Sequence, residues 1–306
     1  MKFKKIKRRY IDNYYKVFPK NESLIFQKAK LINFDRLKIA IPITKTINFT
    51  YTDSYFDKVA IENQSNLEWE LKKESLFNCH IQTLLGINEI SINGNILILD
   101  ITGKIVSKEE NLGYLNKYTI KCALNKVKNS NAPISFNVNE AIKSAYLLYC
   151  DITQDICVSD PNEILKTFKL LLPSCSNRFK VIKYKTGLML TPIAKSVKDS
   201  LCVYKKHDEI IRKPSNYLAS EYRKTIGTAC IEKTKNILRI ERHLGSWKAI
   251  RKALGVDKKN KIPLISALNS KTKPILNRLR DYRISIIDLK EKIESTQNIG
   301  ETNNED

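Results

Sequence analysis

Residues 236–244 read NILRIERHL, and apolar and charged side chains alternate along them. A period of two is the period of a β-strand, whose successive side chains point to opposite faces. The alternation separates two sets of side chains: Arg239, Glu241 and His243 on one face, and Leu238, Ile240 and Arg242 on the other. The stretch therefore predicts a strand in a sheet with one buried face and one charged face.

Strand signals also occur earlier in the chain. Residues 37–51, LKIAIPITKTINFTY, are rich in β-branched residues and partly alternate, and Pro42 indicates an edge or an interruption. Residues 89–102, EISINGNILILDIT, place Asn93 and Gly94 between two apolar runs, which is a strong short-range signal for a β-hairpin. We therefore expect antiparallel strands in the N-terminal half.

The middle of the chain predicts a strand, a turn and a helix. Residues 144–153, SAYLLYCDIT, indicate a buried strand, and residues 159–172, SDPNEILKTFKLLL, indicate a helix. Asp160 is the expected N-cap of this helix, with Pro161 at its first position and Glu163 in its first turn.

Two more strands are expected at residues 187–192, GLMLTP, and 200–206, SLCVYKK, and a helix at 216–235. Two later stretches, 246–256 and 271–293, have amphipathic helical patterns with a basic face. The sequence thus predicts an α+β fold, with a central antiparallel sheet flanked by helices and a small helical C-terminal part.

The charge of the chain favours a polyanionic partner. Its 306 residues include 54 Lys and Arg against 32 Asp and Glu, which gives a formal net charge of +22 and suits binding to a phosphate backbone. Seven scattered cysteines without a CxxC pair do not indicate a disulfide framework or a zinc site. We expect no membrane span and a cytoplasmic location, because no apolar run approaches the roughly 18 residues that a span needs.

Shifts in composition divide the chain into four predicted parts. Residues 1–32 form a basic segment, residues 33–255 the main domain, and residues 256–291 a helical part expected to bind DNA. Residues 292–306 form an acidic tail that we expect to be disordered.

Three carboxylates stand inside apolar strand-like runs, and their placement needs a partner. Asp100 lies in ILILDIT, Asp151 in LLYCDIT and Glu241 in ILRIERH. An ionised carboxylate in an apolar interior costs several kcal/mol unless it pairs with a cation or binds a metal. Oxygen ligands suit Mg²⁺ or Mn²⁺, which bridge carboxylates and phosphate oxygens, so a metal site at these residues is one prediction. Strand-end acids that face water or pair with lysine are the alternative.

The stretch SLCVYKKHDEI, residues 200–210, ends an apolar run in a tyrosine with charged neighbours. Tyr204 has a phenol of ordinary pKa about 10, so its attack on phosphorus near neutral pH requires a base or a positive neighbour. Lys206, His207 or a bound metal could supply either. An ordinary strand tyrosine, one of 14 in the chain, is the alternative.

Other catalytic patterns are missing from the sequence. The three histidines, His80, His207 and His243, are too far apart for a His-hydrophobic-His metal motif. No GxxxxGK[ST] occurs, so an ATP-driven motor is not indicated.

Residues 203–210, VYKKHDEI, followed about thirty residues later by ILRIERHLGSWKAIRKALGV, together resemble the gene II replication initiators of filamentous phages. That family shows a Tyr followed by Lys, His and Glu, and then a strand with an Arg-x-Glu-Arg pattern. Residues 147–153, LLYCDIT, and 99–116, LDITGKIVSKEENLGYLN, are similar to its acidic strands. Two departures are Cys150, where a basic residue is more typical, and a shorter C-terminal part.

The resemblance implies a rolling-circle initiator that nicks one strand at a phage or plasmid origin. Tyr204 would form the 5′-phosphotyrosine link, Lys206 and His207 would assist it, and Mg²⁺ or Mn²⁺ would be the cofactor. The implied metal ligands are Asp100, Asp151, Glu209 and Glu241, and the expected DNA-binding residues are Lys205, Arg239, Arg242, Lys248 and Arg251. Its expected partners are origin DNA, both double- and single-stranded, and a host polymerase and helicase.

Two alternatives stay open on the sequence. One is a DNA-binding plasmid initiator or regulator without enzymatic activity, which would place the C-terminal helices in the major groove. The other is an RNA-binding protein in which the positive charge is the functional feature.

Overall fold

The computed structural model describes most of the main domain predicted from the sequence and part of the helical segment after it. The described residues are 31–51, 56–59, 76–79, 86–106, 113–129, 134–158, 160–171, 179–194, 198–211, 232, 234–256 and 261–281.

A ten-stranded sheet forms the centre of the protein, in the order β3-β4-β5-β6-β1-β8-β12-β11-β10-β9, and each neighbouring pair is antiparallel. Its strands are β1 (Asn33–Pro42), β3 (Phe56–Val59), β4 (Leu76–Cys79), β5 (Ile87–Asn93), β6 (Ile96–Thr102), β8 (Tyr146–Cys157), β9 (Phe179–Tyr184), β10 (Gly187–Pro192), β11 (Asp199–Lys205) and β12 (Ile237–Leu244). Two short strands, β2 (Thr50–Tyr51) and β7 (Ile134–Ser135), pair separately. The central antiparallel sheet predicted from the sequence is confirmed.

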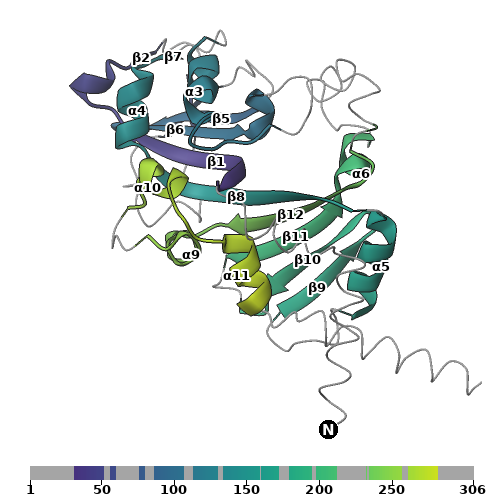
Figure 1. The fold of residues 1–306 in the computed structure, drawn as a ribbon. Helices are drawn as coiled ribbons and strands as arrows, with labels where there is room; N and C mark the ends of the chain where they lie inside the picture. Colours follow the sequence, from purple (N-terminus) through teal and green to yellow (C-terminus); the bar gives the residue numbers. More distant parts are fainter. Residues whose placement is uncertain are drawn as a thin grey trace, which may run out of the picture.

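Helices pack against this sheet. They are α3 (Ile120–Lys128), α4 (Val138–Ser144), α5 (Pro161–Leu171), α6 (Lys206–Ile211), α9 (Trp247–Leu254), α10 (Leu264–Leu268) and α11 (Pro274–Asp281), with short 3₁₀ turns η1 (Lys45–Ile47) and η4 (Gly103–Ile105). In Figure 1, α9, α10 and α11 lie over one face of the sheet, where they contact β8 and β12. One large cluster of buried apolar side chains joins strands and helices on this face.

Local sequence signals place several of these elements correctly. β5 and β6 form the predicted hairpin, although Asn93 closes β5 and the turn residues are Gly94 and Asn95. Asp160 caps α5, because its Oδ1 accepts hydrogen bonds from the backbone N–H groups of Asn162 and Glu163. Pro42 ends β1.

Other elements follow from tertiary packing and carried no clear sequence signal. Strand β9 and the helices α3, α4 and α10 were not predicted. The helix expected over 216–235 lies almost entirely outside the described residues, as do the basic segment before residue 31 and the tail over 292–306. Among the described residues, no helix is both long enough and apolar enough to cross a membrane.

Candidate active site

Strands β11 and β12 bring Tyr204 and Glu241 together on the polar face of the sheet. Tyr204 stands opposite Arg239 in the antiparallel register, and Cys202 stands opposite Glu241. The two side chains meet diagonally, and the Tyr204 hydroxyl donates a hydrogen bond of 2.6 Å to Glu241 Oε1. A tyrosine and a carboxylate in this contact have the arrangement that a nucleophile and its proton acceptor require.

Gly187 leaves room for this tyrosine. It stands opposite Tyr204 on β10, and a Cβ added there would lie 2.7 Å from Tyr204 Cβ and 2.6 Å from the carbonyl oxygen of Val203. Both distances are shorter than real Cβ contacts, so only glycine permits the observed position of Tyr204.

The environment raises the pKa values of both partners. Burial and the neighbouring charge of Asp35 raise the pKa of Glu241 from 4.5 to about 7, against the opposing effect of Arg239. Burial together with Glu209 and Glu241 raises the pKa of Tyr204 well above 10. Tyr204 is therefore a neutral phenol near neutral pH, and Glu241 is half ionised there and can accept its proton.

Arg239 organises the carboxylates around this pair. It is fully buried, and its guanidinium donates to both oxygens of Asp155, at 2.6 and 2.8 Å, and to Asp35 at 2.8 Å. Glu241 Oε1 lies 3.8 Å from its Nη1. Burial would raise the pKa of Asp155, but the bonds and charge of Arg239 outweigh this effect and lower it.

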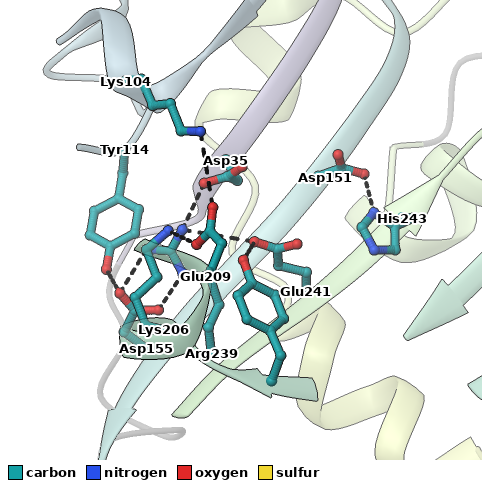
Figure 2. A network of polar contacts seen from close by, with 11 residues as sticks. Asp35, Lys104, Tyr114, Asp151, Asp155, Lys206, Glu209, Arg239, Glu241 and His243 are labelled. Atoms are coloured by element: carbon teal, nitrogen blue, oxygen red, sulfur yellow. Dashed lines mark hydrogen bonds and ion pairs between the residues drawn. The ribbon is translucent and has the colours of Figure 1, made fainter. Parts of the chain in front are cut away.

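Helix α6 adds a second cation to the network. Lys206 is buried and pairs with Glu209, whose other oxygen lies 4.0 Å from Lys104 Nζ. Burial opposes ionisation of Glu209, yet Lys206 and Lys104 lower its pKa. Figure 2 shows the members of this network around Arg239: Asp35, Lys104, Tyr114, Asp155, Lys206, Glu209 and Glu241.

A second polar cluster lies along the same face of the sheet. Asp151 Oδ1 accepts a hydrogen bond from the Tyr149 hydroxyl and lies 2.6 Å from His243 Nδ1. Burial would lower the pKa of His243, but hydrogen bonds to Asp151 and Cys202 and the charge of Asp151 raise it to about 10. His243 is therefore an imidazolium at neutral pH.

Only two of the four predicted carboxylates share a site: Glu209 and Glu241 belong to the network around Arg239, whereas Asp100 and Asp151 have other partners. Asp100 pairs with Arg36, Asp151 with His243, Glu209 with Lys206, and Glu241 with Tyr204. Among the residues that the structure describes, no group of three or more His, Cys, Asp or Glu is arranged to hold a metal ion. The carboxylates as arranged here do not fit the predicted cluster, and metal binding stays a prediction.

The other predicted residues take varied positions. The Lys205 ammonium contacts Asp208 and Asn162, and His207 Nδ1 lies 3.3 Å from Thr234 Oγ1. Arg251 stacks over Trp247 on α9, and its neighbour Lys248 is exposed.

Two arginines that the sequence predicts to bind DNA are buried in the structure. Arg242 lies on the opposite face of β12 from Tyr204, buried against Asp199 and the Pro274 carbonyl oxygen. Arg239 is on the charged face, but its guanidinium is buried beneath the carboxylates and is not exposed to a ligand. Both arginines bind acids of this chain because an unpaired charge at such depth is costly.

Sequence reasoning missed Asp35, Asp155, Tyr114 and Lys104. A signal for Asp155 was present: it lies four positions after Asp151 on the same strand, and the period of two places both side chains on the charged face. Asp35 lies within an irregularity in the pairing of β1 with β8, between Phe34 and Arg36, and no pattern in a single sequence reveals such a shift.

The fold and the site define an α+β protein with an antiparallel sheet and a tyrosine-glutamate pair within a buried ionic network. Among solved structures, the chain is similar to the rolling circle replication initiator protein from Geobacillus stearothermophilus, with a TM-score of 0.32 and 11% identity over 69% of this chain and 72% of that chain. No family model and no curated protein matches the sequence. A TM-score of this size transfers neither a fold nor an activity, so the function must follow from the site itself.

Proposed function

We propose that the protein is a rolling-circle replication initiator that nicks one DNA strand at a phage or plasmid origin through Tyr204. The observation that carries this proposal is the 2.6 Å hydrogen bond from the Tyr204 hydroxyl to Glu241, a carboxylate whose pKa is raised to about 7. A base with a pKa near the working pH is well matched to proton transfer.

In the proposed step, the Tyr204 oxygen attacks a phosphodiester phosphorus and its proton passes to Glu241. The bond from phosphorus to the 3′ oxygen breaks, and this oxygen takes a proton from water to give a free 3′-hydroxyl. The 5′-phosphate remains on Tyr204, which conserves the bond energy for strand rejoining without ATP. A new 3′-hydroxyl then loses its proton to water and attacks the same phosphorus, the bond from phosphorus to the Tyr204 oxygen breaks, and Glu241 returns its proton to that oxygen.

Neighbouring cations support the same chemistry. Arg239 and Lys206 offset the carboxylate charges beside Tyr204, which keeps an acidic site compatible with an approaching phosphate. Mg²⁺ or Mn²⁺ is the predicted cofactor, and it would neutralise charge on the non-bridging phosphate oxygens. Origin DNA, a host polymerase and a helicase in the cytoplasm of the host cell complete the proposed setting.

The test is a nicking assay on supercoiled DNA from the genetic element that encodes this chain, with Mg²⁺, Mn²⁺ or EDTA. Wild type should convert supercoiled DNA to open circles and leave a peptide containing Tyr204 that carries a nucleotide, detected by mass spectrometry. Tyr204→Phe should do neither.

Tyr149→Phe is the matched control, because it removes a carboxylate-bound phenolic hydroxyl from the same face of the sheet. It should keep nicking activity. Intact supercoiled DNA with wild type, or equal nicking by Tyr204→Phe, would overturn the proposal and favour a DNA-binding regulator without enzymatic activity.

A further inference from the structure

Residues 113–129 form a basic segment that begins next to Tyr114, a member of the network around Arg239. The segment, GYLNKYTIKCALNKVKN, contains four lysines and no acidic residue. Lys117, Lys121 and Lys128 are exposed, and the opposite side of α3 is buried through Ile120, Ala123, Leu124 and Val127. A local patch of one sign attracts a polyanion without competing acids.

An exposed aromatic ring stands at the start of this patch. Tyr118 is 71% exposed, more than any other large apolar or aromatic side chain of the described residues. Lys117 Nζ lies 4.9 Å from the centre of its ring. A tyrosine that gains nothing from burial, beside a lysine, suits stacking with a nucleic-acid base.

The turn that carries Tyr118 is held by its own hydrogen bonds. Asn116 Oδ1 accepts from the backbone N–H of Tyr118, and Thr119 Oγ1 donates to the carbonyl oxygen of Tyr114. Asn116 Nδ2 also donates to Asn33 Oδ1 at the start of β1. Tyr118 is therefore presented to solvent on an ordered turn, which reduces the entropic cost of stacking on it.

The same turn is joined directly to the catalytic network. The backbone of Leu115 exchanges two hydrogen bonds of 2.9 Å with Phe34, the residue before Asp35. Tyr114 donates a hydrogen bond to Asp155, the carboxylate held by Arg239. Lys117, the first lysine of the segment, thus follows Tyr114 by three residues in the sequence.

We propose that Lys117, Tyr118 and Lys121 form a binding surface for single-stranded DNA, with one unpaired base stacked on Tyr118 and phosphates on the two lysines. This inference rests on the proposed function, because it assigns the surface to the strand that leads into the Tyr204 site. Single-stranded DNA fits better than a duplex, since only an unstacked base offers a free face to the ring.

The test measures equilibrium binding of a fluorescent 20-nucleotide oligothymidylate in the Tyr204→Phe background, where no cleavage can occur. Tyr118→Ala should weaken binding about tenfold, and Tyr118→Phe should bind like the parent because it keeps the ring. An oligonucleotide with abasic positions should bind the parent more weakly than oligothymidylate does. It should bind the Tyr118→Ala variant and the parent with equal affinity, because it offers no base to stack on the ring. Lys117→Ala with Lys121→Ala should lower the salt dependence of binding by about one phosphate contact for each lysine.

Tyr184→Ala is the matched control. Tyr184 is 45% exposed and lies between Lys183 and Lys185, but on the edge strand β9, where it stands opposite Gly187, and not in the segment 113–129. This variant should bind as the parent does. Equal losses for Tyr118→Ala and Tyr184→Ala, no loss for Tyr118→Ala, or a preference for duplex DNA or RNA would each overturn the inference.

The two proposals fail separately. If the wild type does not nick DNA but Tyr118→Ala weakens single-strand binding, the binding surface stands and the proposed reaction is wrong. If the wild type nicks DNA and Tyr118→Ala binds oligothymidylate as well as the parent does, only the proposed binding surface is wrong.

Discussion

Two buried arginines stand three residues apart on β12 and have opposite surroundings. Arg242 is enclosed with Asp199, which is 5% exposed, and with the Pro274 carbonyl oxygen and Arg278. Arg239 binds Asp155 and Asp35, whose side chains are 13% and 26% exposed. One arginine ties helix α11 to the sheet, and the other holds acids at a surface that solvent reaches.

The difference indicates that one arginine of β12 mainly supports the stability of the fold, whereas the other supports the reactivity of the candidate site. The partners of Arg242 are satisfied within the fold, so its removal should cost stability. The acids beside Arg239 include Glu241, which keeps a pKa of about 7 and is bonded to Tyr204, so changes there should act mainly on reactivity. Four predictions test this division.

The largest effect is expected at Glu241. Glu241→Gln removes the proton acceptor for Tyr204 and should lower the nicking rate about 10²- to 10⁴-fold, with a melting temperature near that of wild type. The wild-type rate should rise as pH increases through about 7, because Glu241 accepts a proton only when ionised. A rate–pH profile of the Gln variant that keeps this rise would show that another group is the base.

Arg242→Ala should reverse the pattern. Asp199 would lose its bidentate partner at a buried position, and we expect a loss of about 3 kcal/mol in the free energy of unfolding, measured with urea. Arg239→Ala should cost less stability and more activity, because Asp35 and Asp155 can gain water. Equal stability losses in the two variants would remove the distinction between the arginines.

Gly187→Ala should disturb the site through packing. The new Cβ would press on Tyr204 and Val203, with a cost of about 1–3 kcal/mol in stability and a lower nicking rate. Gly245→Ala is the control, since its nearest contact would be Lys198 Cβ at 3.2 Å, a milder overlap than the contacts of 2.6 and 2.7 Å at Gly187. A fully active Gly187→Ala protein would contradict the tight fit of Tyr204.

The smallest effect is expected at His243, where only the pH dependence of stability should change. Its pKa of about 10 in the folded protein exceeds the ordinary value of 6.5, so its contribution is present below pH 6.5 and declines as pH rises toward 10. His243→Gln should make the melting temperature depend less on pH between about 6.5 and 10. An unchanged slope would assign the pH dependence to other groups.

Local patterns in the sequence predict much of the sheet but not its order. The alternation in residues 237–244 correctly separates Arg239 and Glu241 from Arg242, and Asp160 correctly marks the start of α5. Those signals are local. The placement of β1 beside β8 joins residues more than one hundred positions apart, and nothing in a single sequence encodes that pairing visibly.

The candidate site was predictable only in part for the same reason. Tyr204 and Glu241 were both selected from the sequence, and the structure brings them into contact. Asp35 and Asp155 reach Arg239 from two other strands, so they emerge only when the strand order is known. Asp100, Asp151 and Glu241 lie on three different strands, and each has a partner of its own: Arg36, His243 and Tyr204, respectively.

The position of β8 also governs how the chain can be made. It lies between the group β3-β4-β5-β6-β1 and the group β12-β11-β10-β9, yet β12 is the last of the described strands along the chain. Until β12 has been synthesised, the backbone N–H and C=O groups of β8 that pair with β12 in the folded protein have no partner in that strand. Asp151 and Asp155 stand on that temporary edge, and charged side chains on an open edge discourage pairing with other chains. We therefore expect Asp151 and Asp155 to discourage such pairing by the nascent chain until β12 has been synthesised.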